Sequence, residues 1–203
     1  IIRAGDGGPS IDSADVITDF EDNNDLIGMA NGLEFNQLTI EQGTGDYANH
    51  VVVKKNDTGE FLVIIQNINT DNINYYDIVS TSTDAQTLTG TSGDDILLGG
   101  SGNDTFTTGA GTDVVLGYGG DDTVTIHGAG NKTIDGGAGT NTVAIAYGSI
   151  TGLQDFTTRS LDSDYKLTLV DADNNTITLA NILELSLASA ATGISVADID
   201  YDF

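Results

Sequence analysis

The stretch that decides the fold is residues 90–144, which divides into six blocks of nine. The blocks read GTSGDDILL (90–98), GGSGNDTFT (99–107), TGAGTDVVL (108–116), GYGGDDTVT (117–125), HGAGNKTID (127–135) and GGAGTNTVA (136–144). One extra residue, Ile126, separates the fourth block from the fifth. The shared pattern is GGxGxDxUx, in which U is a large apolar residue. A fixed period of this kind predicts a stack of repeated structural units.

Two positions of the block carry the chemistry. Position eight is always apolar and is occupied by Leu97, Phe106, Val115, Val124, Ile134 and Val143. Position six holds Asp95, Asp104, Asp113 and Asp122, and then Lys132 and Asn141. Glycine at positions one, two and four allows backbone conformations that other residues resist, so carbonyl oxygens can turn inward. Stacked carboxylates would repel one another without a cation between them, and oxygen ligands of this kind suit a hard cation such as calcium.

These blocks resemble the repeats-in-toxin (RTX) calcium-binding nonapeptides of secreted bacterial proteins. The resemblance is sharp over residues 90–144, about a quarter of the chain. It implies an all-β fold, a parallel β-roll (β-solenoid), in which each nonapeptide supplies one calcium-binding turn and one short strand. A metal-free β-solenoid, whose Asp side chains only hydrogen-bond the turns, is the alternative. An EF-hand fits worse, because its bidentate Glu at loop position twelve and its flanking helices are missing.

In a β-roll the nonapeptides alternate between two sides, so each calcium ion is expected between one repeat and the second repeat after it. One side then stacks Asp95, Asp113 and Lys132, and the other stacks Asp104, Asp122 and Asn141. The pairs Asp95/Asp113 and Asp104/Asp122 are expected to bind one Ca²⁺ each. Asp122/Asn141 is expected to be a weaker third site, because an amide oxygen is a neutral ligand.

Between Asp113 and Lys132 no calcium is expected, because an ammonium group replaces a ligand there. The Lys132 side chain either neutralises Asp113 or points outward, and Ile126 is expected to disturb the register nearby. The turn residues expected to complete the ligand sets are Gly90, Ser92, Gly99, Gly100, Ser101, Gly102, Gly109, Gly111, Gly117, Gly119 and Gly120.

The flanks are expected to be β-rich caps. HVVVKKNDTGEFLVIIQNI (50–68) and YKLTLVDADNNTITLANI (165–182) predict two hairpins of the same design, and residues 15–20 and 33–42 predict further strands. Residues 181–191 suit a helix or a strand equally. The expected division is an N-terminal capping region (1–80), a connector (81–89), the roll (90–144) and a C-terminal cap (145–203).

Charge and composition exclude several partners. The chain has 203 residues, 31 acidic against 6 basic side chains, and a net charge of −25, so nucleic acid and anionic membranes are poor partners. The longest apolar run, at residues 61–65, is far shorter than the roughly 20 residues that cross a membrane, so no membrane insertion is expected. There is no Cys, which excludes disulfides and thiolate metal sites.

No catalytic residue is expected, and Ca²⁺ is the only expected cofactor. The motifs HExxH and GxSxG and a phosphate-binding loop are absent, and neither histidine, His50 or His127, belongs to a catalytic motif. The acid pairs Asp162/Asp164 and Asp171/Asp173 lie in turn-like strings, where loops or calcium ligation are favoured over a glycosidase pair. Tyr75 and Tyr76 are expected to cover a core edge rather than to stack on a sugar.

Three functions fit the sequence. The first is a calcium-dependent module of a secreted bacterial protein, extracellular or at the cell surface, that acts as a scaffold or a fold-and-export domain. The second is an adhesion or ligand-binding module for a glycan or a surface. Ice is disfavoured, because position five is irregular: Asp94, Asn103, Thr112, Asp121, Asn131 and Thr140. The third is the noncatalytic C-terminal region of a larger secreted enzyme.

Both ends of the chain carry expectations of their own. The start, IIRAGDGG, lacks an initiator Met and predicts that the chain is part of a longer polypeptide. The end, ISVADIDYDF (194–203), is similar to the uncleaved C-terminal signals of RTX proteins exported by type I systems. A buried last strand would have the same pattern.

Overall fold

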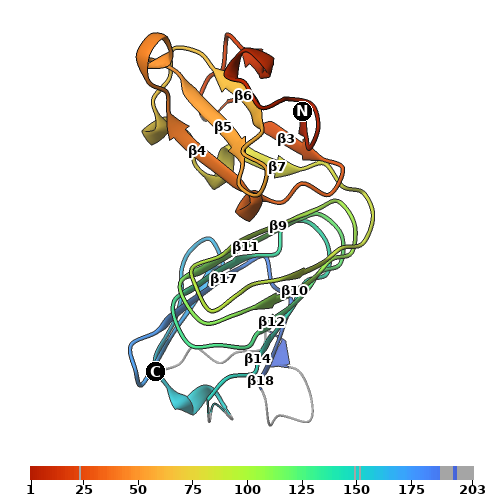
Figure 1. Cartoon of the computed structure of the whole chain (residues 1–203). Coiled ribbons are helices and arrows are strands. Elements are labelled where there is room, and N and C mark those ends of the chain that lie inside the picture. The colour runs from red at the N-terminus through yellow and green to blue at the C-terminus, as the bar shows by residue number, and fades with distance from the viewer. Residues whose placement is uncertain (23, 149, 151, 188–193, 196–203) are drawn as a thin grey trace. The chain divides into compact units, whose positions relative to one another are not determined.

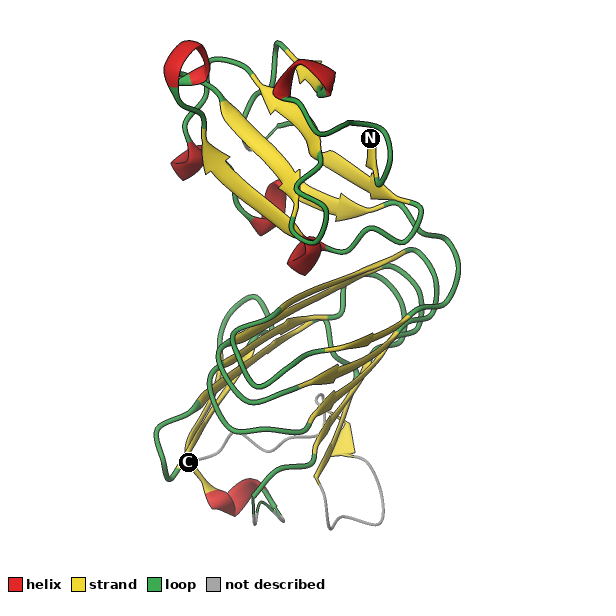
Figure 2. Cartoon of the chain, in the orientation of Figure 1, coloured by secondary structure: helices red, strands yellow, loops and turns green. Residues whose placement is uncertain are grey.

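The chain is almost entirely β, and it divides into two units. The structure is a computed structural model, and it describes residues 1–22, 24–148, 150, 152–187 and 194–195. The units are Ile1–Ser82 and Thr83–Phe203. Over the described ranges the only helices are six short 3₁₀ turns (Figure 2). None of them is long and apolar enough to span a membrane.

The first unit contains two small sheets. A three-stranded parallel sheet has the order β1-β3-β7 and comprises β1 (Ile2–Arg3), β3 (Ile27–Ala30) and β7 (Ile78–Ser80). A four-stranded sheet has the order β2-β6-β5-β4 and comprises β2 (Asp15–Ile17), β4 (Leu38–Gln42), β5 (Val51–Lys55) and β6 (Phe61–Ile65). The 3₁₀ turns of this unit are η1 (Ile11–Ser13), η2 (Phe35–Gln37), η3 (Gly45–Tyr47), η4 (Thr70–Asn72) and η5 (Tyr75–Asp77).

Strands β5 and β6 form the first predicted hairpin, with antiparallel pairing across the turn at residues 56–59. The strand expected at residues 33–42 starts only at Leu38. The residues before it form η2, because the Gln37 side chain turns back to accept the Glu34 N–H.

In the second unit, successive strands from β8 to β14 alternate between two sheets (Figure 1). One sheet contains β8 (Thr87–Thr89), β10 (Thr105–Thr108), β12 (Thr123–Ile126), β14 (Thr142–Ile145) and β18 (Glu184–Leu187). The other contains β9 (Ile96–Gly100), β11 (Asp113–Tyr118), β13 (Lys132–Asp135) and β17 (Thr176–Ala180). Every neighbouring pair among these nine strands is parallel. The predicted all-β fold with parallel stacked strands is therefore confirmed, although the described strands form separate sheets rather than one closed solenoid.

The nine-residue period sets the register and the core. Thr105 pairs with Thr123, two repeats later, and Val115 pairs with Leu97 in the same way. All six position-eight side chains are 2% exposed or less and belong to one apolar cluster. These side chains form the interior of the unit, because the position that recurs once in each repeat always faces the space between the sheets.

The extra residue Ile126 does not disturb the register, so that expectation was wrong. Ile126 is the last residue of β12, is fully buried, and pairs with Thr108 on one side and Ile145 on the other. Strand β12 has four residues, as β10 does, and Thr108↔Ile126 still has the ordinary offset of 18 residues. The offset becomes 19 at Asp113↔Lys132, so the turn between β12 and β13 accommodates the extra residue.

The C-terminal region continues both sheets. The second predicted hairpin is confirmed by the antiparallel pairing of β16 (Leu167–Asp171) with β17, and β17 joins β13 in parallel. The open question at residues 181–191 resolves into strand β18, which joins β14, while residues 188–191 lie outside the described ranges. Strand β15 (Phe156–Leu161), preceded by η6 (Leu153–Asp155), pairs with β16, and β19 (Ile194–Ser195) pairs with β18.

Candidate metal centre

The position-six side chains form two buried columns beside the apolar core, with the members that the sequence predicts. In the first column the N–H of Asp95 donates to Asp113 Oδ1 (3.1 Å). In the second, the N–H of Asp104 donates to Asp122 Oδ1 (2.8 Å), and that of Asp122 donates to Asn141 Oδ1 (2.9 Å). One oxygen of each later residue is therefore fixed by the backbone two repeats earlier, and the structure brings the predicted pairs together.

The second oxygens of Asp104 and Asp122 have no partner. Both Oδ2 atoms are buried and accept no hydrogen bond. Burial raises the pKa of Asp104, and it raises the pKa of Asp122 to about 6, with repulsion from Asp104 adding to the rise. A buried carboxylate oxygen without a partner is costly. These two atoms are placed where a cation would be strongly stabilising.

The turn glycines leave room for such a cation. A Cβ on Gly99 would lie 2.8 Å from the carbonyl oxygen of Gly117 and would overlap Asp104 Oδ2. A Cβ on Gly117 would lie 2.6 Å from the carbonyl oxygen of Gly136 and would overlap Asp122 Oδ2. Each orphaned carboxylate oxygen therefore lies near a turn carbonyl, in a space that only glycine leaves open. Carboxylate and carbonyl oxygens are the ligands that Ca²⁺ takes in proteins.

The turns would have to supply most of the ligands. In the part of the chain that the structure describes, no three His, Cys, Asp or Glu side chains gather as a metal-binding group. Gly111 and Gly120, at position four, have φ of +105° and +100°, which L side chains rarely adopt. The side chains of Ser92 and Ser101 are exposed, so these two residues could contribute through the backbone. The individual turn ligands remain predictions.

The Asp95/Asp113 pair differs from the other column. Asp95 Oδ2 accepts from the N–H (2.6 Å) and the hydroxyl (3.0 Å) of Thr91. Thr91 stands at position two, where the pattern has glycine, and this substitution is the sequence signal for the difference. The turn therefore gives Asp95 a hydroxyl partner that a glycine at position two cannot supply.

Lys132 points inward, which settles the orientation that the sequence left open. Its Nζ lies 3.0 Å from Asp113 Oδ2 and donates to the carbonyl oxygens of Gly111 (2.6 Å) and Ala129 (3.3 Å). Both members of the ion pair are 0% exposed. Burial raises the pKa of Asp113, and the Lys132 ammonium opposes that rise. The sequence did not single out Ala129, whose carbonyl accepts from Lys132, or Gly136, whose carbonyl lies near Asp122 Oδ2.

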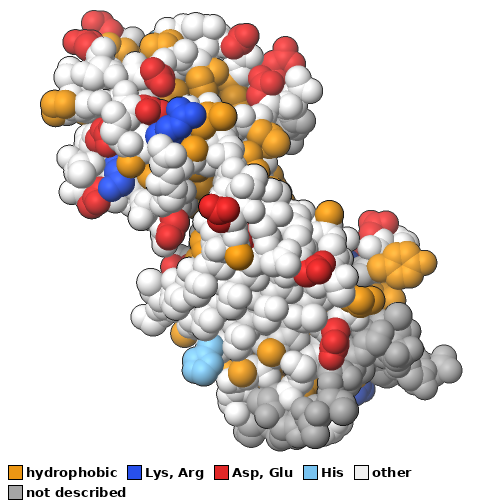
Figure 3. All heavy atoms as spheres, turned by 90° about the vertical axis from the view of Figure 1, so that its right-hand side faces the viewer, with side chains coloured by type: hydrophobic (Ala, Val, Ile, Leu, Met, Phe, Trp, Pro, Cys, Tyr) orange, Lys and Arg blue, Asp and Glu red, His pale blue; other side chains and the backbone are white. Residues whose placement is uncertain are grey.

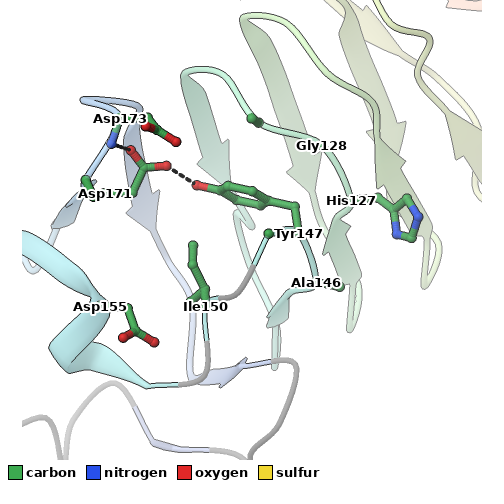
Figure 4. Close-up of a pocket in the computed structure, with 11 residues that line it drawn as sticks. His127, Gly128, Ala146, Tyr147, Ile150, Asp155, Asp171 and Asp173 are labelled. Atoms are coloured by element: carbon green, nitrogen blue, oxygen red, sulfur yellow. Dashed lines mark hydrogen bonds between the residues drawn. The ribbon is translucent and has the colours of Figure 1, made fainter.

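The other acidic groups considered from the sequence act in turns. Asp171 lines an open pocket of about 690 Å³ that also includes His127, Tyr147 and Asp173 (Figure 4). Its Oδ2 accepts from the Tyr147 hydroxyl (2.9 Å), and its Oδ1 accepts from the N–H groups of Asp173 and Asn175. Burial opposes ionisation, yet these hydrogen bonds hold the pKa of Asp171 below its usual value. Its oxygens are satisfied by the turn, as the sequence predicts for a loop residue.

The remaining candidates have only local contacts or are exposed. Asp162 Oδ1 accepts from the N–H groups of Asp164 and Lys166, again within a turn. His127 is exposed, and His50 Nδ1 accepts from the N–H of Asn67. Figure 3 shows a face on which the second unit is largely polar but uncharged, with single carboxylates standing apart.

Parallel strands at a two-repeat offset, glycine turns and buried carboxylate columns define a class of repeat module in which metal ligands lie in the turns. Residues 89–124 and 128–144 match the family model of the RTX calcium-binding nonapeptide repeat, in four copies. This segment therefore consists of RTX repeats, which confirms the resemblance drawn from the sequence. No curated protein sequence matches the chain significantly.

Proposed function

We propose that the second unit is a calcium-dependent β-roll in a secreted bacterial protein, where it acts as a scaffold and export module. The observation that carries the proposal is the pair of buried carboxylate oxygens without partners, on Asp104 and Asp122. Calcium would remove the cost of burying these charges, and its binding would then be coupled to folding. A calcium-rich extracellular medium suits such a module.

The strongest proposed sites are Asp104/Asp122 and Asp122/Asn141. Both contain an Oδ2 atom with no partner and a turn carbonyl near it. Asp122 belongs to both, because its Oδ1 lies on the Asp104 side and its Oδ2 faces the next turn. Asp95/Asp113 is proposed as a weaker site, because the turn at Thr91 already satisfies Asp95 Oδ2.

Calcium titration of the whole chain tests the proposal. We expect saturable binding by calorimetry, a higher melting temperature with calcium than with EGTA, and a gain of β signal in circular dichroism. The double variant Asp104→Asn/Asp122→Asn should lose ions. The matched control Asp94→Asn/Asp121→Asn removes two exposed carboxylates from turns of the repeats and should keep the ions. A wild-type chain that binds no calcium at millimolar concentrations refutes the proposal.

The export function is proposed from the sequence of the last ten residues. Strand β19 includes two of them, and residues 196–203 lie outside the described ranges. The test expresses the chain with and without residues 196–203 in cells that carry a type I exporter. Export of the shortened chain at the full rate would contradict this role.

A second candidate function, the binding of an ordered uncharged surface such as ice, is favoured by threonines on one sheet. Position seven and position nine of alternate repeats face outward and form two rows across the strands: Thr87, Thr105, Thr123 and Thr142, and beside them Thr89, Thr107 and Thr125. Neighbours are about 4.8 Å apart across the strands and about 6.7 Å apart along them. Position five, in the turns, is irregular, whereas these strand positions form a regular uncharged grid of hydroxyl and methyl groups.

The grid function is tested by thermal hysteresis and ice-recrystallisation assays in calcium. Thr105→Lys and Thr123→Lys should abolish any activity. Thr133→Lys places the same charge on the outward side of the opposite sheet, on β13, and should leave it unchanged. A wild-type chain without activity excludes this candidate and leaves the calcium proposal unaffected.

A further inference from the structure

Lys132 is buried where four of the six repeats carry an aspartate. Its side chain is 0% exposed, a rare state for lysine, whose charge normally reaches water. The pairing of β11 with β13 places it level with Asp113 in the same register that continues to the neighbouring strands. Lys132 is therefore an integral member of the first column.

The ammonium group contacts the kinds of oxygen that a calcium ion would take at this level. They are one carboxylate oxygen, Asp113 Oδ2, and two turn carbonyls, those of Gly111 and Ala129. An ammonium has three N–H donors, and these three acceptors match them in number. The buried charge has a complete set of partners.

The equivalent oxygens in the other column lack any such partner. Asp104 Oδ2 and Asp122 Oδ2 are buried without a hydrogen bond or a cationic side chain, whereas Asp113 Oδ2 has Lys132. The charge balance is also equivalent. Two aspartates and one Ca²⁺ sum to zero, and so do one aspartate and one lysine. A single side chain thus replaces both the second carboxylate and the metal.

We infer that the ammonium of Lys132 is a built-in substitute for a calcium ion, so that the Asp113 level of the stack is held together without metal. The inference rests on the proposed calcium function and concerns how that function is distributed. Calcium dependence is concentrated in the Asp104–Asp122–Asn141 column. The column that contains Lys132 retains the ion pair between β11 and β13 in calcium-free medium, so these two strands stay linked there without a metal ion.

The decisive experiment restores the repeat pattern. Lys132→Asp recreates GGxGxD in the fifth block and should convert the level into a calcium site, raising the number of ions bound per chain by one in calorimetric titration. The melting temperature of this variant in EGTA should fall well below that of the wild type, and calcium should restore it. Lys132→Asn, which imitates the Asp122/Asn141 pair, should show the same gain with weaker affinity.

Lys132→Met separates the ion pair from simple packing. It keeps an unbranched side chain, removes the charge, and leaves Asp113 buried without a partner. We expect its melting temperature to fall by about 10 °C or more in EGTA, with no additional calcium bound. Lys166→Asp is the matched control for Lys132→Asp, because it makes the same charge change at an exposed position and should alter neither ion number nor stability appreciably.

The outcomes separate this inference from the proposed function. If the wild type binds calcium but neither Lys132→Asp nor Lys132→Asn binds a further ion, the inference is wrong and the proposed function stands. An unchanged melting temperature for Lys132→Met in EGTA also overturns it. If the wild type binds no calcium at all, the proposed function fails, and the substitution of a calcium ion by Lys132 fails with it.

Discussion

Replacing Asp122 with asparagine should change stability in opposite directions with and without calcium. Asp122 is 1% exposed; its Oδ1 accepts from the Asp104 N–H, and its Oδ2 has no partner. Asparagine has the same shape and keeps the Oδ1 acceptor. Its amide nitrogen replaces the orphaned oxygen in the space that faces the Gly136 carbonyl, where a donor is favourable. The substitution therefore removes a buried charge without creating a cavity.

The size of the effect follows from the pKa of Asp122. Burial raises that pKa from 3.8 to about 6, a difference of about two units, and each unit corresponds to about 1.4 kcal/mol. At pH 7 without calcium, the ionised carboxylate thus costs the folded state about 3 kcal/mol, which the variant regains. For a unit of this size that is a rise of roughly 10 °C in melting temperature. With calcium, the variant loses a charged ligand from both proposed sites, so affinity should fall about tenfold or more.

Melting curves of both proteins in EGTA and in saturating calcium measure the reversal. The adjacent variant Asp121→Asn is the matched control, because Asp121 is exposed and the asparagine keeps the acceptor for the Thr140 N–H. It should shift neither curve by more than a degree or two, consistent with a surface change of about 0.5 kcal/mol or less. Lower stability of Asp122→Asn in EGTA would refute the argument that this carboxylate is an unpaired buried charge.

Three further outcomes are expected. Without calcium, the stability of the folded state should be greatest below about pH 4 and decline toward pH 6 as Asp122 ionises, because the pKa of Asp122 is higher in the folded state than in the unfolded state. With saturating calcium, stability should rise over the same pH window. A pH series of melting curves measures both trends. Gly99→Ala places a methyl group against Asp104 Oδ2, so it should lower the free energy of unfolding by about 1–3 kcal/mol and weaken calcium binding in a calorimetric titration. Gly93→Ala is the control and should change neither, because the nearest atom to its added Cβ is the Thr91 hydroxyl at 3.7 Å. Tyr147→Phe removes one hydrogen bond to the buried carboxylate of Asp171, so the free energy of unfolding in denaturant should fall by about 1–3 kcal/mol while the calcium response stays unchanged. A lost calcium response would place Tyr147 in the metal site.

The nine-residue period predicts the core and the pairing of the columns well. An apolar residue once in each repeat, as at Phe106 and Val124, can only face the interior of a two-sheet stack, and the structure places both there. The same period brings Asp104 to Asp122. The hairpins were predictable for a similar reason, since each consists of two strands joined by a turn of polar residues.

Features that depend on how the turns pack around a single residue were not predictable from the sequence. The sequence shows that Lys132 interrupts the aspartates, but only the packing of the turn around Gly111 shows that its ammonium is enclosed. Ile126 looked like a break in the period, yet the turn after β12 takes up the extra residue, and the strands on both sides of that turn keep their parallel pairing. Thr91 replaces a glycine, and its hydrogen bonds to Asp95 depend on how the turn closes.

The two-sheet stack has ends that differ from its middle, and this makes its length adjustable. Strands β10, β11 and β12 pair only with the strands two places before and after them, while antiparallel β15, β16 and β19 complete the C-terminal side. Duplication of one 18-residue unit within the repeats would add one strand to each sheet and leave both ends as they are. The gene of such a protein can therefore gain or lose whole levels by unequal recombination, and the reach of the module can evolve separately from the segments that flank it.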